Sequence, residues 1–502
     1  MSDDNLDRLI SRRSLLRRGS CAALGLGGLL SQIHTLRMTH AALAATSGLN
    51  DYRALVCVFL FGGNDSGNTV IPMSGSANGQ DHAYYASRRA DLALPEGLLN
   101  NTRITPANGG GRTFALHPKL GGVADLFASG DVSVVANVGS LVEPTNKSQY
   151  QNGSVDLPPQ LFAHNTQQEL WQISTADADA RIGWGGRVAD TLQACGANPN
   201  ATVSMNLSIA GNNFFQAGNQ VLPYAVRPGG AGGLNTRWVG PNANGTDNPR
   251  VAEAYTDLIA LQHNENYSGR HHLRRAFADI ADRSLTNSSI IEQLFDRPTA
   301  IAPLAGGVSG LTRQLNTVAR LIEHGQAALN HTRQVFFVAI GGFDHHDGLV
   351  ADADGNGPHG QRLTELNEGL TSFWTELGQL GMRDKVTTFT ASDFGRTFKS
   401  NGNGSDHGWG GHHFVMGGSQ LARGPVAGNP PADRGLMFGS FNDLAIDGPE
   451  DTGNGRYIPT TSVDEYAHEF ARWMGVPASE MSTVFPNLNR FQGERAPLNM
   501  LS

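Results

Sequence analysis

The stretch QVFFVAIGGFDHHDG, from Gln334 to Gly348, decides the fold together with VTTFTASDFGRTFKSNGNGSDHGWGGHHFVMGG, from Val386 to Gly418. In each, a short apolar run ends at a turn that is followed by Asp and His. The stretch RALVCVFLFGGNDSGN, from Arg53 to Asn68, has the same plan, with Asp65 after the turn. Such apolar runs predict strands that are buried on both faces. Ligands bind beyond the carboxyl ends of strands in an open α/β sheet, so we expect one site there.

Helical periodicity alternates with these strands along the chain. Apolar residues spaced three or four apart between Leu363 and Leu380 predict a long helix, which would link two parallel strands as a crossover. The other main predicted elements are strands at 132–138 and 414–416, helices between 258 and 322, and a last helix with a capping box of Ser462 and Glu465. The alternation predicts an α/β fold, a three-layer sandwich with a mostly parallel central sheet and helices on both faces.

Composition limits the class of protein. The chain has 502 residues and a net charge of −8, and it shows no basic block beyond the N-terminus. These features exclude a nucleic-acid binder. We expect one α/β domain at 46–502, because large sheets hold many residues in one domain, with a mainly helical region around 234–330. After the N-terminal region no apolar stretch reaches about 18 residues, so no membrane association is expected.

The first 45 residues are predicted to be an export signal. Ser11 to Leu16 form a twin-arginine pattern, an apolar stretch runs from Ala22 to Leu30, and Ala42 to Ala44 offer a cleavage site. The alternative is a basic surface helix. The signal predicts a periplasmic or secreted protein whose partner in export is the twin-arginine machinery. Such substrates usually cross the membrane already folded, often with a cofactor loaded.

Two cysteines remain after the predicted cleavage, Cys57 and Cys195. Cys57 lies inside an apolar strand, which is typical of a small buried hydrophobic residue. A disulfide with Cys195 is the alternative in an oxidising compartment. The chain has no CxxC pair and no Cys-rich zinc pattern.

Metal-ligating residue types gather in two clusters. These are Asp344-His345-His346-Asp347, and Asp406-His407 followed by His412-His413. Mixed carboxylate and imidazole ligands suit Zn²⁺, Mn²⁺ or Fe better than Mg²⁺ or Ca²⁺. Two clusters and the distant Asp65 predict two metal ions. The alternative is that they are polar turns at loop tips.

Four histidines, two of them within these clusters, are weaker candidates. Neighbouring residues on an extended chain point opposite ways, which weakens His345 and His413. His117 and His164 are expected to be structural.

The sequence around Asp393 invites a kinase interpretation, because Asp393-Phe394-Gly395 is a DFG triplet. We reject it because there is no Gly-rich ATP loop with its lysine and no HRD loop. Arg396 is a candidate for binding an anionic substrate group, since its fork matches phosphate or sulfate. A buried ion pair with Asp393 is the alternative. The chain has no P-loop, no GxGxxG and no GxSxG.

Several ordered motifs carry a resemblance to a known family. They are GGND followed by GNTVIP, then GGFDHHD, SDFGRT and SDHGWGGHHFVMGG. Together they resemble an uncharacterised family of twin-arginine-exported bacterial proteins, placed in the alkaline phosphatase and sulfatase-like superfamily. The resemblance covers nearly all of the chain after the signal. It implies an alkaline phosphatase-like fold, two metal sites and activity on phosphate or sulfate esters.

The resemblance also implies a role for each ligand. Asp65, Asp406 and His407 would hold one metal. The other metal would be held by Asp344, His346 and His412.

The nucleophile is where the chain departs from the superfamily pattern of Ser, Thr or formylglycine. Related chains carry Ser before His in the segment that matches Phe162 to Asn165, where this chain has Ala163. Ser148 and Thr166 lie nearby in the sequence as substitutes. Sulfatase-type activation is disfavoured because no Cys or Ser sits in a CxPxR-like motif.

Two functions from different classes are left open. The first is an exported metal-dependent hydrolase of phosphate or sulfate esters, with two divalent ions, Zn or Mn, and a small anionic ester as substrate. Arg396 and Ser148 are its candidate catalytic residues. Direct attack by metal-activated water would not need the missing hydroxyl. The alternative is a non-catalytic binding or assembly protein on the same fold.

Overall fold

The computed structural model describes residues 49–174, 181–229, 272–352, 354–426, 432–491, 493 and 497–502, together with 253, 254, 257, 259 and 260. The predicted export signal therefore lies outside the described residues, as does much of the predicted helical region before residue 272. The domain boundary at residue 46 likewise stays a prediction. No helix in the described part of the chain is long and apolar enough to cross a membrane.

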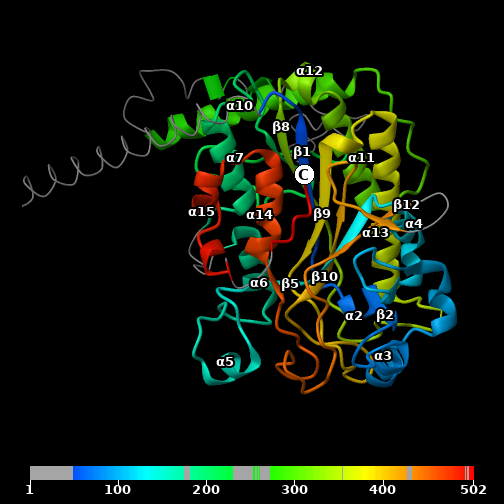
Figure 1. The fold of residues 1–502 in the computed structure, drawn as a ribbon. Coiled ribbons are helices and arrows are strands. Elements are labelled where there is room, and N and C mark those ends of the chain that lie inside the picture. Colours follow the sequence, from blue (N-terminus) through cyan, green and yellow to red (C-terminus); the bar gives the residue numbers. More distant parts are fainter. Residues whose placement is uncertain are drawn as a thin grey trace, which may run out of the picture.

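A nine-stranded sheet forms the centre of the protein, in the order β13-β5-β10-β9-β1-β8-β6-β7, with β14 beside β5 (Figure 1). Its strands are β1 (Arg53–Leu60), β5 (Val132–Gly139), β6 (Asn206–Ser208), β7 (Tyr224–Ala225), β8 (Arg333–Ile340), β9 (Val386–Ser392), β10 (Gly411–Met416), β13 (Met437–Phe438) and β14 (Thr461–Ser462). β10 runs antiparallel to β5 and β9, and the other pairs in this sheet are parallel. The mostly parallel sheet predicted from the sequence is confirmed.

Three strand ends meet at one edge of this sheet. β1 pairs in parallel with β8 on one side and with β9 on the other, so Leu60 lies opposite Ile340 and Ser392. The loops that follow these strands therefore leave at the same carboxyl edge. β10 is antiparallel, so the loop that precedes it reaches the same edge. The predicted crossover is α13 (Pro358–Gln379), which connects β8 to β9.

Helices cover both faces of the sheet (Figure 1). On one face α4 (Gly121–Ala128), α11 (Gly310–Glu323) and α13 contribute to a core that includes Val56 and Val58 of β1. On the other face α7 (Trp184–Ala194), α14 (Val463–Met474) and α15 (Met481–Val484) pack around Leu55, Cys57 and Phe59. Side chains alternate between the faces of a strand, so β1 must be apolar throughout.

The structure shows the outcome of two finer predictions, on the start of α14 and on the two cysteines. The capping box that begins α14 is present, because the Ser462 hydroxyl accepts from the Glu465 amide and the Glu465 carboxylate accepts from the Ser462 amide. Cys57 and Cys195 are both buried and free, so the alternative of a disulfide between them is wrong.

Further helices and two small sheets complete the described part of the chain. They are α2 (Ser66–Thr69), α3 (His82–Arg89), α5 (Lys147–Asn152), α6 (His164–Ile173), α10 (His272–Phe295), α12 (Gly325–Leu329), the antiparallel strands β2 (Val70–Ser74), β4 (Thr113–Leu116) and β3 (Arg103–Ile104), and the pair β11 (Gly424–Val426) and β12 (Ala432–Arg434). Short 3₁₀ turns include Glu96–Thr102 and Pro118–Leu120.

Asp464 in the first turn of α14 should make stability depend on pH. Burial raises the pKa of this carboxyl to about 7, although the Ser174 hydroxyl and the Arg187 charge act in the opposite direction. The folded state thus prefers the neutral carboxyl. The contribution of this group to the free energy of unfolding is complete below the unfolded pKa of about 4 and is lost as pH rises through about 7. We expect Asp464→Asn to raise the free energy of unfolding at pH 8 by roughly 2 to 4 kcal/mol, and by less at pH 5.

Denaturant unfolding of both proteins at the two pH values measures this difference. Asp156→Asn is the matched control, because the Asp156 side chain is 80% exposed. An Asp464→Asn gain that is the same at pH 5 and pH 8 would contradict the assignment.

Candidate metal centre

The carboxyl edge of the sheet brings together side chains from four segments. Asp344 and His346 follow β8, and Asp393 and Arg396 follow β9. Asp406 and His407 lie in the loop before β10, and His164 is the first residue of α6.

Gly62, in the loop after β1, allows these loops to approach. Its φ is +113°, and a Cβ there would lie 2.6 Å from the Asp344 amide nitrogen. A side chain at this position would therefore push the β1 and β8 loops apart.

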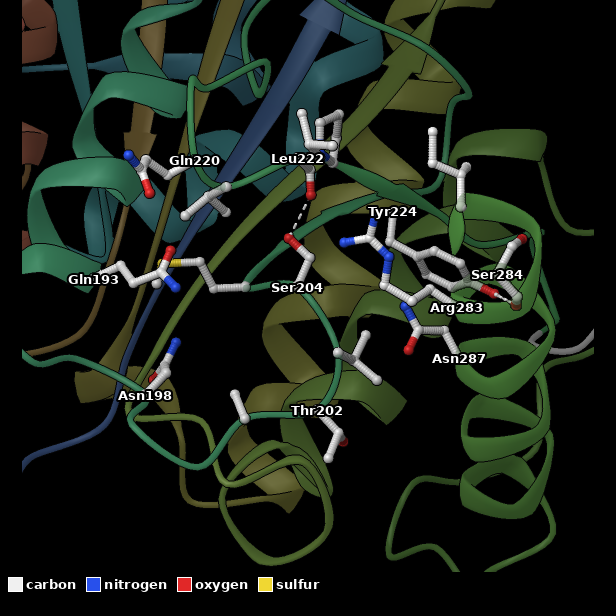
Figure 2. A pocket seen from close by; sticks show the side chains of 16 residues that line it. Gln193, Asn198, Thr202, Ser204, Gln220, Leu222, Tyr224, Arg283, Ser284 and Asn287 are labelled. Atoms are coloured by element: carbon white, nitrogen blue, oxygen red, sulfur yellow. Dashed lines mark hydrogen bonds between the residues drawn. The ribbon is translucent and has the colours of Figure 1, made fainter. Parts of the chain in front are cut away.

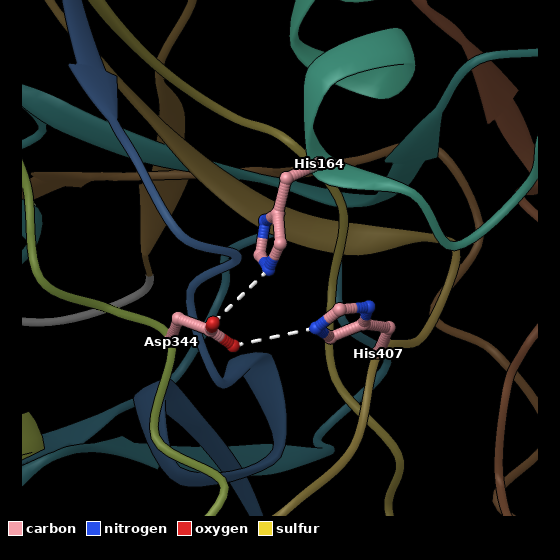
Figure 3. A group of neighbouring side chains, drawn as sticks. All are labelled: His164, Asp344 and His407. Carbon is pink, nitrogen blue, oxygen red and sulfur yellow. Dashed lines mark hydrogen bonds and ion pairs between the residues drawn. The ribbon is translucent and has the colours of Figure 1, made fainter.

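His164, Asp344 and His407 point toward one another (Figure 3), and their ligand atoms all lie within 4.8 Å. His164 Nε2 is 3.3 Å from Asp344 Oδ2, and His407 Nε2 is 3.3 Å from Asp344 Oδ1. His346 joins them, with its Nε2 3.0 Å from Asp344 Oδ1 and 2.9 Å from His407 Nε2. Tetrahedral ligands with bonds of about 2.0–2.1 Å stand about 3.3 Å apart, which the two contacts of Asp344 with His164 and His407 match.

The three histidines have their other ring nitrogen occupied by an oxygen acceptor. His164 Nδ1 lies 2.7 Å from Asp393 Oδ2, and His407 Nδ1 lies 2.6 Å from the Phe162 carbonyl oxygen. His346 Nδ1 lies 3.2 Å from Asp406 Oδ1. Carbonyl and carboxylate oxygens only accept, so each Nδ1 is placed to donate, and in that tautomer the Nε2 atom carries the lone pair that binds a metal ion.

The three Nε2 atoms face the Asp344 carboxylate. His346 Nε2 and His407 Nε2 lie 2.9 Å apart, a contact that needs a proton or a metal ion between the two nitrogens. Metal-bound histidines are oriented in this way, with the second nitrogen donating to a carboxylate or carbonyl. The donor set therefore fits a divalent metal ion.

Asp393 and Arg396 each form a hydrogen bond with one of the candidate ligands. Asp393 is 1% exposed, and its Oδ2 accepts from His164, from Gln168 Nε2 at 2.7 Å and from the Gly62 amide at 3.1 Å. The Asp393 hydrogen bond raises the pKa of His164. Arg396 donates to Asp344 Oδ1 at 2.9 Å. Burial acts to raise the pKa of Asp344, but the Arg396 hydrogen bond and charge outweigh it and bring that pKa to about 2.

Four of the six predicted ligands lie in or directly against this group: Asp344 and His407 belong to it, His346 contacts both of them, and Asp406 contacts His346. Asp65 and His412 have other contacts.

Asp65 is 1% exposed, forms an ion pair with Arg89 and accepts from the Ser405 hydroxyl at 3.2 Å. Its side chain also accepts from the Asn68 amide and caps α2. His412 lies in β10, where its Nδ1 accepts from the Asn137 amide at 3.0 Å and its ring stacks on Phe441. Burial lowers the pKa of His412 to about 3. The ligand role of both residues stays a prediction.

The donors of Arg396 are directed into the protein. The Arg396 side chain is fully buried and donates to Asp344, to the Gly62 carbonyl and to Ser405. The alternative ion pair with Asp393 is therefore wrong, because the carboxylate partner is Asp344.

No hydroxyl is presented to the metal ligands at the start of α6. Ala163 directly precedes His164, and the Thr166 hydroxyl donates to Gln160. Ser148 is exposed on α5, and no hydrogen bond within the described residues joins it to the centre.

His164 is the candidate ligand that the sequence analysis did not single out. It was expected to be structural, because a lone His in a long polar segment shows no ligand spacing. Its partner Asp393 lies 229 positions away. The one signal that could have singled it out is its place at the start of a helix, next to the position where the resembling family carries Ser.

A second hollow lies at the opposite edge of the sheet. This pocket of about 460 Å³ opens between the segment 201–205, which precedes β6, and α10 (Figure 2). Arg283 is the one charged residue among those that line it, and Leu222 and Ile280 are each 56% exposed. No His, Cys, Asp or Glu is among the residues that line this pocket.

Residues 318–434 match the sequence profile of a family described as "Protein of unknown function (DUF1501)". This stretch contains all of the candidate metal-ligand residues named above except Asp65 and His164. No curated protein matches the chain.

Solved structures share some of the fold at low sequence identity. One is Ps i-CgsB, crystallised with k-i-k-neocarrahexaose, at 10% identity and a TM-score of 0.34 over 88% of this chain and 77% of that chain. Another is the lipoteichoic acid synthase LtaP from Listeria monocytogenes, at 9% identity and a TM-score of 0.27 over 74% of this chain and 66% of that chain. These likenesses concern the fold alone.

Proposed function

We propose that this protein is an exported metal-dependent hydrolase of phosphate or sulfate esters. The observation that carries the proposal is the convergence of three histidine Nε2 atoms on one carboxylate, Asp344. Bound there, a divalent ion such as zinc or manganese would supply a Lewis acid that activates water and offsets charge on an anionic ester. Export rests on the sequence pattern of the first 45 residues alone.

The chain's own residues hold and orient this centre. His164, His346 and His407 turn their Nε2 atoms toward Asp344, and the acceptors Asp393, Asp406 and the Phe162 carbonyl fix their ring orientations. Arg396 keeps Asp344 ionised throughout the neutral pH range. This arrangement preorganises the ligands.

One metal ion, rather than the two expected from the sequence, is what this geometry supports. Within the described residues one group of His and Asp side chains meets the spacing of a metal site. Asp65 is already compensated by Arg89, and His412 is turned to a backbone amide. We therefore propose His164, Asp344 and His407 as ligands, with His346 as a fourth because its Nε2 contacts both Asp344 and His407.

A second candidate function is a binding or assembly protein in which the metal is structural. Ala163 favours it, because the residue before His164 offers no hydroxyl for a covalent intermediate. The two candidates differ in turnover and not in metal content.

Metal removal tests the proposal. Protein matured in its own host should contain about one equivalent of a transition metal by native mass spectrometry. A panel of phosphate monoesters, phosphate diesters and sulfate esters should show turnover that a chelator abolishes and that added Zn²⁺ or Mn²⁺ restores. Metal without any turnover favours the second candidate, and a protein free of transition metal overturns both.

A further inference from the structure

We propose that Arg456 binds the tetrahedral anionic group, phosphate or sulfate, of the substrate beside the metal centre. This inference rests on the proposed function and adds to it the residue that recognises the anion. The role was expected of Arg396, whose donors are instead turned into the protein.

The Arg456 side chain is attached to the metal centre at two points. Its Nε donates to the backbone carbonyl of His407 at 2.8 Å. Its guanidinium lies over the Phe162 ring, 5.1 Å from the ring centroid, and the Phe162 carbonyl is the acceptor for His407 Nδ1. The guanidinium is thus fixed next to two groups that position one metal ligand.

The backbone of Arg456 is held as firmly as its side chain. Asp451, which is fully buried, accepts hydrogen bonds from the amides of Gly453, Gly455 and Arg456. The turn that carries Arg456 therefore has little freedom. An anion would meet a preorganised guanidinium, and less side-chain entropy would be lost on binding.

Arg456 still has donors to offer. Neither of its two terminal amino groups donates a hydrogen bond to a residue in the described part of the chain, and Arg456 is half-buried. A guanidinium fork of this kind matches two oxygens of a phosphate or sulfate group.

The other arginines near the loops are already engaged. Arg89 is buried against Asp65, and Arg362 on α13 pairs with Glu365 at 2.8 Å. Among the described arginines at this edge, Arg456 combines attachment to a metal ligand with unoccupied donors.

Anion titrations of the zinc-loaded protein test the inference. Wild type, Arg456→Met and Arg456→Lys are titrated separately with inorganic phosphate and with sulfate by calorimetry, after metal affinity has been measured for each. Arg88→Met is the matched control, because Arg88 also stacks on an aromatic ring, Tyr84, but is exposed and outside the centre. Thermal melts confirm that each variant is folded.

We expect at least one of the two anions to bind wild type, and to bind Arg88→Met with the same affinity. Arg456→Met should weaken that binding about tenfold or more, and Arg456→Lys should lie between them because it keeps the charge and loses the fork. Metal affinity should stay unchanged in all of them. The more tightly bound anion identifies the ester class.

Two results overturn the inference and leave the proposed function standing: equal anion affinity in wild type and folded Arg456→Met, or no binding of either anion to metal-loaded wild type that still turns over an ester. Failure of wild type to bind zinc would instead remove the proposed function, and the inference with it.

Discussion

Replacing Asp344 by Asn is expected to remove the metal ion from the protein. Asp344 is the only carboxylate that lies within 3.3 Å of the Nε2 atoms of His164, His346 and His407 in the described structure. An amide supplies no negative charge to balance the ion, and it leaves the buried Arg396 guanidinium without its carboxylate partner. Removing an outer-shell partner of a ligand costs about 10- to 100-fold in metal affinity, so loss of the ligand itself should cost about 100-fold or more.

Competition with a zinc-binding dye measures this affinity. Asp347→Asn is the matched control, because Asp347 lies in the same loop but its carboxylate accepts from Asn403 and not from the histidines. It should keep the wild-type metal affinity, and any ester turnover should be lost in Asp344→Asn alone. A folded Asp344→Asn protein that binds zinc as tightly as wild type would be evidence that the centre is wrongly assigned.

Replacing Arg89 by Met should destabilise the fold strongly without affecting the metal. Arg89 and Asp65 are both fully buried, and Arg89 also donates to the carbonyls of Thr397 and Phe398 at 3.0 Å. Removing one partner of a buried ion pair leaves an uncompensated charge, which costs about 3–5 kcal/mol. Denaturant unfolding measures the loss. Arg103→Met breaks an exposed pair with Glu96 and should cost less than about 1 kcal/mol.

The companion substitution Asp65→Asn decides the role of Asp65. If Asp65 serves the fold, the variant loses stability and its folded fraction keeps wild-type metal affinity. If Asp65 is a metal ligand, as the resemblance implies, metal affinity falls as far as in Asp344→Asn. Chelator competition on folded protein separates these two outcomes.

Local patterns were sufficient for much of the fold. The apolar runs that contain Leu55, Val335 and Phe389 are strands, because a strand covered on both faces must be apolar at every position. The capping box at Ser462 could also be predicted, because its hydrogen bonds join residues only three apart. The direction of β10 was not readable, because a short strand carries no signal of the direction in which its partner runs.

The sequence by itself determined that Asp and His gather after buried strands, and hence at which edge of an α/β sheet they would meet. Only the tertiary structure decided which of them face one another. The contribution of His164 depends on how a distant helix start docks against Asp393, and the burial of Asp65 depends on Arg89 from another segment. The physical reason is the separation in sequence of the residues that interact. Backbone periodicity depends on neighbours in the chain, whereas a ligand set depends on packing between segments hundreds of residues apart.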